Sequence, residues 1–117
     1  MIAIFDRRGR TVGWLDDSSI LDMANRHRAF VETEAVFSYR ARYLGTFREG
    51  FFRDRGGYAV AFIEGAEGGP LTPIPQIPRI PPIPPIAPIP PIPPIPPIPP
   101  IPKLSWSQLT WEEFLAQ

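Results

Sequence analysis

Residues 4–67 consist of one sixteen-residue segment repeated four times, and this repeat limits the folds open to the chain more than any other feature. The units 4–19, 20–35, 36–51 and 52–67 align without a gap. Their first position is always apolar, and their tenth is always glycine or alanine. The two columns are Ile4, Ile20, Val36, Phe52 and Gly13, Ala29, Gly45, Ala61. Such a repeat predicts units that bury their apolar faces only against one another, and hence fourfold pseudo-symmetry.

The third and sixth positions of each unit predict a tight turn. The third is Asp or Ser, and the sixth is Gly, Asn or, once, Ala; the pairs are Asp6/Gly9, Asp22/Asn25, Ser38/Ala41 and Asp54/Gly57. Asp and Ser favour the first position of a type I turn, and Gly or Asn accepts the positive φ that closes it. The stretches that follow, such as 10–15 and 58–63, are rich in β-branched and aromatic residues, as strands are. Each unit is therefore expected to be a β-hairpin, with Ala41 as the poorest fit.

Four such hairpins predict an all-β head, residues 1–69, in which eight short strands close into a shallow barrel without a free edge. The Gly/Ala column is expected to lie near the barrel axis, where larger symmetry-related side chains would crowd one another. Trp14 and Phe30 are expected to contact any apolar ligand held in the centre. Arg53 departs from the pattern, because it stands where an apolar residue is preferred.

The segments 4–15 (IFDRRGRTVGWL) and 37–47 (FSYRARYLGTF), together with the sixteen-residue period, resemble the four-fold β-flower family over residues 2–67. The resemblance implies a shallow, symmetric barrel of four hairpin petals with an apolar centre, similar in shape to lipid-binding barrels of the tubby type. It carries over no catalytic residue, because the family has no established activity. It further implies that an Ile-Pro tail and a Trp-containing end accompany the head in some members.

All eighteen prolines lie in residues 70–102, where an isoleucine stands at every third position from Ile74 to Ile101. Polyproline II has three residues per turn, so the ten isoleucines would form one line along a rod, and a straight rod over 74–102 would reach roughly 90 Å. This ridge is expected to pack on the same ridge of another copy, on the head itself or on a partner. Its central residues are Ile83, Ile86, Ile89 and Ile92. The stretch 79–85 (RIPPIPP) also matches the ligand pattern of SH3-like domains, although so proline-rich a tract matches it almost automatically.

The remaining residues, 103–117, hold two of the three tryptophans. Thr110 and Glu113 form a capping-box pattern, which predicts a short helix over about residues 111–116. A helix this short is not stable alone in water. The peptide is therefore expected to dock into a groove as an anchor, through its large apolar side chains. These are Trp106, Leu109, Trp111, Phe114 and Leu115.

Charge and the titratable residues exclude several functional classes. The chain has twelve Lys+Arg and twelve Asp+Glu, so no nucleic-acid partner is expected. It has no cysteine, and its only histidine, His27, is expected on a solvated strand. With no metal cluster and no nucleophile or phosphate-loop motif, we expect a protein without cofactors that is not an enzyme. Arg10, Arg26 and Arg42 share one repeat column, so they would either bind an anionic or lipid head group around one rim or pair with acids of their own hairpins.

The order of residues 1–10, apolar and then basic, is the reverse of a signal peptide, so a cytoplasmic location is expected. The proline tract cannot continue a helix, so no transmembrane segment is expected. The sequence thus favours a non-catalytic binding or assembly module that uses the isoleucine ridge and the Trp-rich end as interaction surfaces. The alternatives are binding of a lipid or another apolar ligand in the centre of the head, and recognition of the tail by SH3-like domains.

Overall fold

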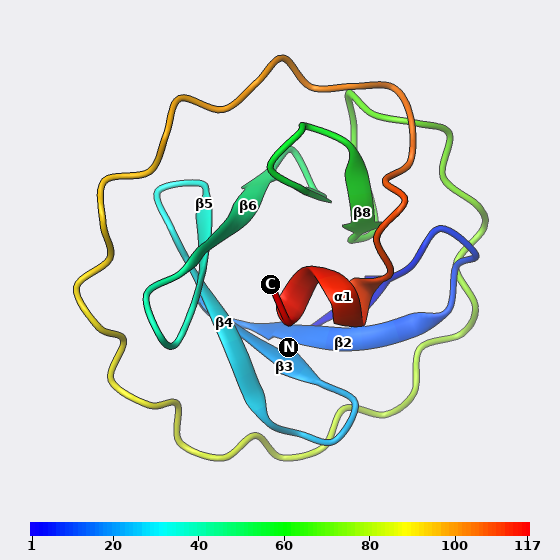
Figure 1. The fold of residues 1–117 in the computed structure, drawn as a ribbon. Coiled ribbons are helices and arrows are strands. Elements are labelled where there is room, and N and C mark those ends of the chain that lie inside the picture. Colours follow the sequence, from blue (N-terminus) through cyan, green and yellow to red (C-terminus); the bar gives the residue numbers. More distant parts are fainter.

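The computed structural model describes all residues 1–117, and it contains eight strands and one short helix (Figure 1). The elements are β1 (Ile2–Phe5), β2 (Thr11–Asp16), β3 (Ser19–Asp22), β4 (His27–Glu32), β5 (Ala35–Ser38), β6 (Tyr43–Arg48), β7 (Phe51–Arg53), β8 (Ala59–Phe62) and α1 (Trp111–Leu115). The strands form a closed antiparallel barrel in chain order. The predicted all-β barrel of four hairpins, followed by a short C-terminal helix, is confirmed.

The four hairpin turns have the predicted local chemistry. In each turn the N–H of the sixth repeat residue donates to the carbonyl of the third, at 2.9 Å for Gly9 to Asp6 and for Ala41 to Ser38. The sixth residue has a positive φ in all four turns, including 64° at Ala41. Ala41 thus adopts the backbone conformation that glycine adopts with less strain. We call these turns the tips; they comprise residues 6–10, 22–26, 38–42 and 54–58.

The hairpins also repeat in their strand register. The barrel closes where β1 pairs with β8, with Phe5 opposite Phe62. Within each hairpin the register shifts once, and the four shifts are sixteen residues apart. They fall at Ile4/Phe5, Ile20/Leu21, Val36/Phe37 and Phe52/Arg53. Because neighbouring strands are antiparallel, the tips lie at one end of the barrel, and the connections between hairpins, which we call the links (16–18, 32–34, 48–50 and 63–67), lie at the other.

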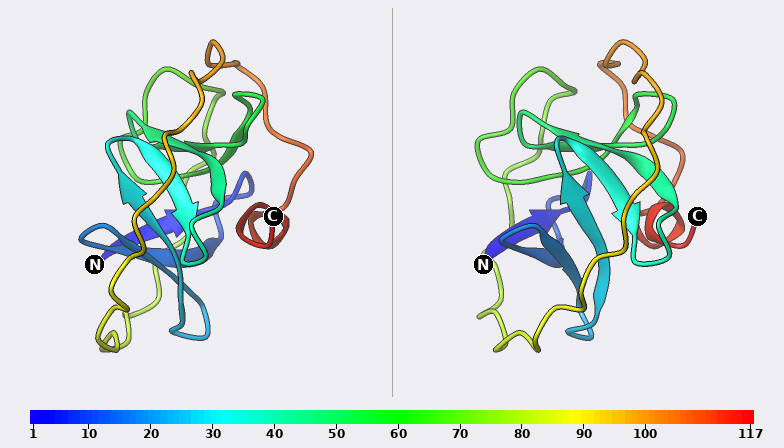
Figure 2. Two further views of the ribbon diagram at one scale, coloured as in Figure 1. Left: turned by 60° about the vertical axis from the view of Figure 1, so that its left-hand side comes forward. Right: turned by 90° about the vertical axis from the view of Figure 1, so that its left-hand side faces the viewer.

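The helix α1 covers the barrel at the tip end (Figures 1 and 2), and its apolar side chains reach the centre. The first residue of every repeat unit is fully buried and belongs to the same apolar cluster as three side chains of α1. The helix is held at the tip end because Ser107 Oγ donates to Asp54 at 2.5 Å and Arg55 donates to the side chain of Gln117 at 2.9 Å. The core is therefore shared between the head and the C-terminal peptide.

The Gly/Ala column faces this centre, but for a reason other than the predicted crowding at the axis. A Cβ on Gly13 or Gly45 would collide with the carbonyl oxygen of Leu21 or Arg53 in the next hairpin. The same Cβ atoms would also touch the aromatic rings of α1. Small residues are therefore needed where neighbouring hairpins and the helix meet.

Residues 70–102, which we call the belt, run once around the outside of the barrel instead of projecting from it (Figure 1). The belt is curved, so it does not reach the roughly 90 Å that a straight rod would span; the molecule measures 36 × 35 × 21 Å. No helix in the structure has the length and apolar character needed to cross a membrane.

Candidate functional site

The belt is attached to the barrel at the tips. Near its start, the N–H of Gln76 donates to the carbonyl of Gly9 at 2.9 Å. Further along, Asn25 Nδ2 donates to the carbonyl of Ile83 at 3.0 Å. At its end, the N–H of Lys103 donates to the carbonyl of Gly57 at 3.0 Å. The first, second and fourth tips thus each hold one section of the belt.

The spacing of these attachments matches the repeat of the head. Successive tips are sixteen residues apart. The belt carbonyls that approach the first, second and fourth tips belong to Ile74, Ile83 and Ile101, which are nine and then eighteen residues apart. Pro75, Pro84 and Pro93, which also stand nine residues apart, are half-buried. Nine residues are three turns of polyproline II, or about 28 Å, so four such steps would close a circle about 36 Å across. The molecule is 36 × 35 Å in its two long dimensions.

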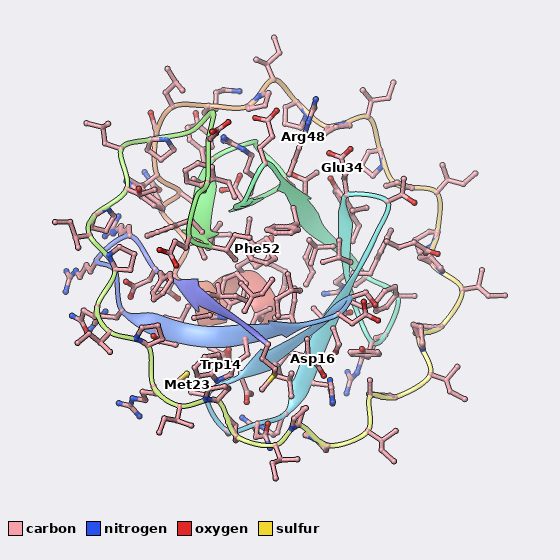
Figure 3. All side chains as sticks on the ribbon, turned by 180° about the vertical axis from the view of Figure 1, so that it is seen from behind. Trp14, Asp16, Met23, Glu34, Arg48 and Phe52 are labelled. Carbon is pink, nitrogen blue, oxygen red and sulfur yellow. The ribbon has the colours of Figure 1, made fainter.

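The isoleucines of the belt all point away from the barrel (Figure 3). Their relative exposure ranges from 81% at Ile101 to 98% at Ile86, and Ile83, Ile89 and Ile92 lie between these values. The ridge was expected to pack on another copy, on the head or on a partner, and the structure corrects the second of these. The head contacts the belt through backbone and proline atoms and not through the isoleucine side chains. We call the ten outward side chains the isoleucine ring. None of them contributes to packing in this molecule.

Arg53 joins the two ends of the belt. Its guanidinium donates to the carbonyls of Gly57 and Lys103, both at 2.8 Å, and of Gly68 at 2.9 Å. Arg53 is only 4% exposed and has no carboxylate partner, and burial lowers its pKa. Its guanidinium also lies 5.3 Å from the centroid of the Phe51 ring. The departure of Arg53 from the apolar column, seen in the sequence, thus marks the point where the belt closes.

His27 holds the belt near the second tip. Its Nε2 lies 2.8 Å from the carbonyl oxygen of Pro85, and its Nδ1 lies 2.6 Å from Ser19 Oγ. A carbonyl only accepts, so Nε2 carries the proton, and in the neutral ring Nδ1 accepts from Ser19. The Ser19 hydroxyl in turn lies 2.8 Å from that of Tyr39. The expected solvated strand residue is therefore half-buried, and both of its ring nitrogens are engaged.

The predicted anchor residues dock into the barrel of their own chain. Trp111, Phe114 and Leu115 are buried in the central cluster. Trp106 packs outside it, with its ring centroid 6.3 Å from Phe51 and 6.1 Å from Phe62. Leu109 is half-buried and borders a cavity at the tip end. The groove expected for this peptide is therefore the open end of its own head, which leaves Trp111, Phe114 and Leu115 inaccessible to a partner.

The capping box of α1 forms as predicted. Glu113 N–H donates to Thr110 Oγ1 at 3.1 Å, and Thr110 N–H donates to the Glu113 carboxylate at 2.9 Å. The bond from the Thr110 N–H lowers the pKa of Glu113.

Arg28, which sequence reasoning did not single out, ties the helix to the second hairpin. Its guanidinium bridges Asp22 at 3.2 Å and Glu112 at 3.0 Å. Burial alone would raise the pKa of Asp22, but the bonds from the Arg26 N–H, the Arg28 guanidinium and the Ala24 N–H lower it below its ordinary value.

The three arginines of one repeat column do not form a free ring. Arg10 and Arg26 pair with Asp6 and Asp22 of their own hairpins, each at 3.2 Å, whereas Arg42 has no ion pair because Ser38 replaces the aspartate. Arg10 and Arg26 border an open cavity of about 590 Å³ between the first two tips and residues 106–112, and Arg42 does not. The indole N–H of Trp111, on the same cavity, is buried without a hydrogen-bond partner.

Trp14 and Phe30 face away from the barrel centre, which contradicts their expected role there. Phe30 stacks on Phe37 and packs at an angle against Tyr39, in a cluster separate from the core, and it is 4% exposed. Trp14 follows the inward Gly13 along β2, so alternation turns it outward. The centre itself is occupied by α1. A ligand there would have to displace the helix and would not touch these two side chains.

Comparison with known proteins extends the resemblance seen in the sequence. The family model described as 4-fold beta flower protein matches residues 2–115, so the match takes in the belt and α1 as well as the four hairpins. No curated protein and no solved structure matches the chain.

Proposed function

This chain belongs to the four-fold β-flower family, which is named for its fold and not for a reaction. We propose that the chain is a non-catalytic protein interaction module that binds through its isoleucine ring. The observation that carries this proposal is the orientation of the belt. Ten isoleucines are 81–98% exposed, while prolines and backbone attach the belt to the tips. A continuous exposed apolar surface of this kind is typical of a binding site.

The belt has already lost the conformational freedom that a free proline-rich tail would lose on binding. The bonds of Arg53 to the carbonyls of Lys103 and Gly68, which we call the clasp, and the bonds from Asn25 and His27 fix the belt in one path. Rigidity of this kind raises affinity by lowering the entropic cost of association. The same bonds disfavour recognition by SH3-like domains, because the RIPPIPP stretch would have to leave Asn25 and His27.

The size of each section decides what kind of partner fits. A nine-residue section presents three isoleucines, and their full burial would contribute about 4.5–9 kcal/mol. Association itself costs an estimated 4–15 kcal/mol, which offsets much or all of this gain, so one section alone binds weakly at best. The partner therefore engages two or more sections at once, either as one concave surface or as several linked contacts. Two straight ridges could align along their whole length. Two convex rings touch over only part of their circumference, so the isoleucine ring of a second copy cannot cover this one.

Site-specific photo-crosslinking tests this proposal. Ile77 and Ile86, nine residues apart, would each be replaced by p-benzoyl-phenylalanine in the producing cell, with the same replacement at Leu104 as control. Leu104 is 74% exposed but lies outside the ring. We expect one partner protein, identified by mass spectrometry, in adducts at both ring positions and not at Leu104.

A second variant tests the ring itself. Changing Ile83, Ile89 and Ile92 to Ser should remove the adduct at Ile86 and leave the thermal unfolding temperature unchanged, since exposed substitutions usually alter stability by no more than about 0.5 kcal/mol. Absence of an adduct at both ring positions, or the same adduct at Leu104, would show that the ring is not the binding surface.

A further inference from the structure

The two ends of the barrel carry opposite charge. The tips together with Arg28 and α1 hold eight arginines against five carboxylates, whereas the links hold seven carboxylates against Arg48 alone. The whole chain is neutral, with twelve basic and twelve acidic side chains. The charge is therefore separated along the barrel axis and not spread evenly over the surface.

Most of these charges have no oppositely charged partner within the molecule. The ion pairs of the structure leave five arginines of the tips unpaired, namely Arg7, Arg8, Arg40, Arg42 and Arg55. They leave six carboxylates of the links unpaired, namely Asp16, Asp17, Glu32, Glu49, Glu64 and Glu67. Figure 3 looks onto the link end, where Glu34 and Arg48 form its one ion pair at 3.3 Å.

We propose that copies of this chain stack head to tail, with the arginine-bearing tip end of one copy on the carboxylate-bearing link end of the next. Two copies that met through the same end would place like charges opposite each other, which costs several kcal/mol in protein interfaces and so excludes that arrangement. A contact between two different surfaces of the same chain is heterologous and leads to an open stack.

The shape of the molecule suits this contact. The disc is 36 × 35 Å across and 21 Å thick, so each end offers about 1,000 Å², against about 800 Å² per partner in a stable interface of standard size. Carboxylates are present in all four links and unpaired arginines in three of the four tips, so rotation by one hairpin still brings opposite charges together. The interface is separate from the isoleucine ring, which faces outward around the stack and stays accessible.

Sedimentation velocity of the full chain, at about 20 mM and about 0.5 M NaCl, tests the proposal, because the higher salt screens charges beyond a few Å. We expect association that grows with protein concentration at low salt and weakens at least about tenfold at high salt. A chain that stays monomeric at low salt, or whose association does not respond to salt, overturns the proposal.

Two charge variants identify the surfaces. The tip variant changes Arg7, Arg8 and Arg40 to Glu, and the link variant changes Glu32, Glu64 and Glu67 to Lys; all six side chains are exposed. Each variant alone should be monomeric at low salt. Their mixture should form short complexes, because the acidic ends of the tip variant accept the basic tips of the link variant.

If only the tip variant loses association, the arginines bind a polyanion and not a second copy, and the stacking proposal is wrong. The Ile83, Ile89 and Ile92 to Ser variant is the control: it should stack as the parent does. Stacking and binding through the ring can therefore fail independently of each other.

Discussion

Replacing Arg53 by Met removes the contacts that close the belt and keeps a side chain of similar length. Three charge-assisted hydrogen bonds to carbonyls are lost, and bonds to charged groups contribute about 1.5–3 kcal/mol each. Two effects offset this loss. A guanidinium buried without a carboxylate partner is costly to desolvate, and Met would pack as the apolar residues of the same repeat column do. The carbonyl of Gly57 also keeps its bond from the Lys103 N–H.

The expected net loss of stability for Arg53→Met is about 2–3 kcal/mol, concentrated where the belt ends. Amide hydrogen exchange should locate it, because the N–H groups of Lys103 and Ser107 donate to carbonyls at this point. A loss of about 2 kcal/mol corresponds to roughly thirtyfold less protection. The matched control is Arg48→Met, which removes one exposed ion pair and should cost less than about 1 kcal/mol. Unchanged protection at Lys103 and Ser107 in Arg53→Met would refute the clasp.

Three further changes test the fold. Ala41→Gly should stabilise the chain by about 0.5–1 kcal/mol in urea unfolding, because it relieves a positive φ, whereas the control Ala29→Gly in a buried strand should destabilise it. Phe114→Ala should cost about 3–5 kcal/mol and release α1, while Leu104→Ala should have almost no effect. The folded-state pKa of Asp22 is lowered, so its carboxylate stabilises the fold above its unfolded pKa and loses this effect as the pH falls through the folded value. The unfolding free energy of Asp22→Asn should therefore change less between pH 7 and pH 3 than that of the parent. An equal change in both proteins would show that the folded state does not lower the pKa of Asp22.

The hairpins could be predicted because their determinants are local. An Asp or Ser followed three residues later by Gly or Asn defines a turn wherever it stands, and the gapless period shows that the turns recur. The capping box of Thr110 and Glu113 likewise acts within one helical turn. Even Ala41 takes the positive φ of its repeat position, at 64°.

The path of the belt could not be predicted, because polyproline II has no internal hydrogen bonds and its carbonyls bond to whatever donors surround them. The donors are side chains of the head, such as Asn25, His27 and Arg53, whose reach is known only once the barrel is closed. One signal was present in the sequence: Arg53 breaks an apolar column, which marks a position with a role outside the repeat.

The amino-acid sequence by itself determined the hairpins, the cap of α1 and the single line of isoleucines, since each depends on residues close together in the chain. Only the tertiary structure decided which way that line faces and where the C-terminal aromatic residues go. Trp111 and Phe114 pack in the centre of the barrel. The C-terminal peptide, which the sequence predicts to bind in a groove, therefore binds within its own molecule. The belt curves because nine of its residues span the distance between neighbouring tips, and the backbone bonds made there turn the isoleucines outward.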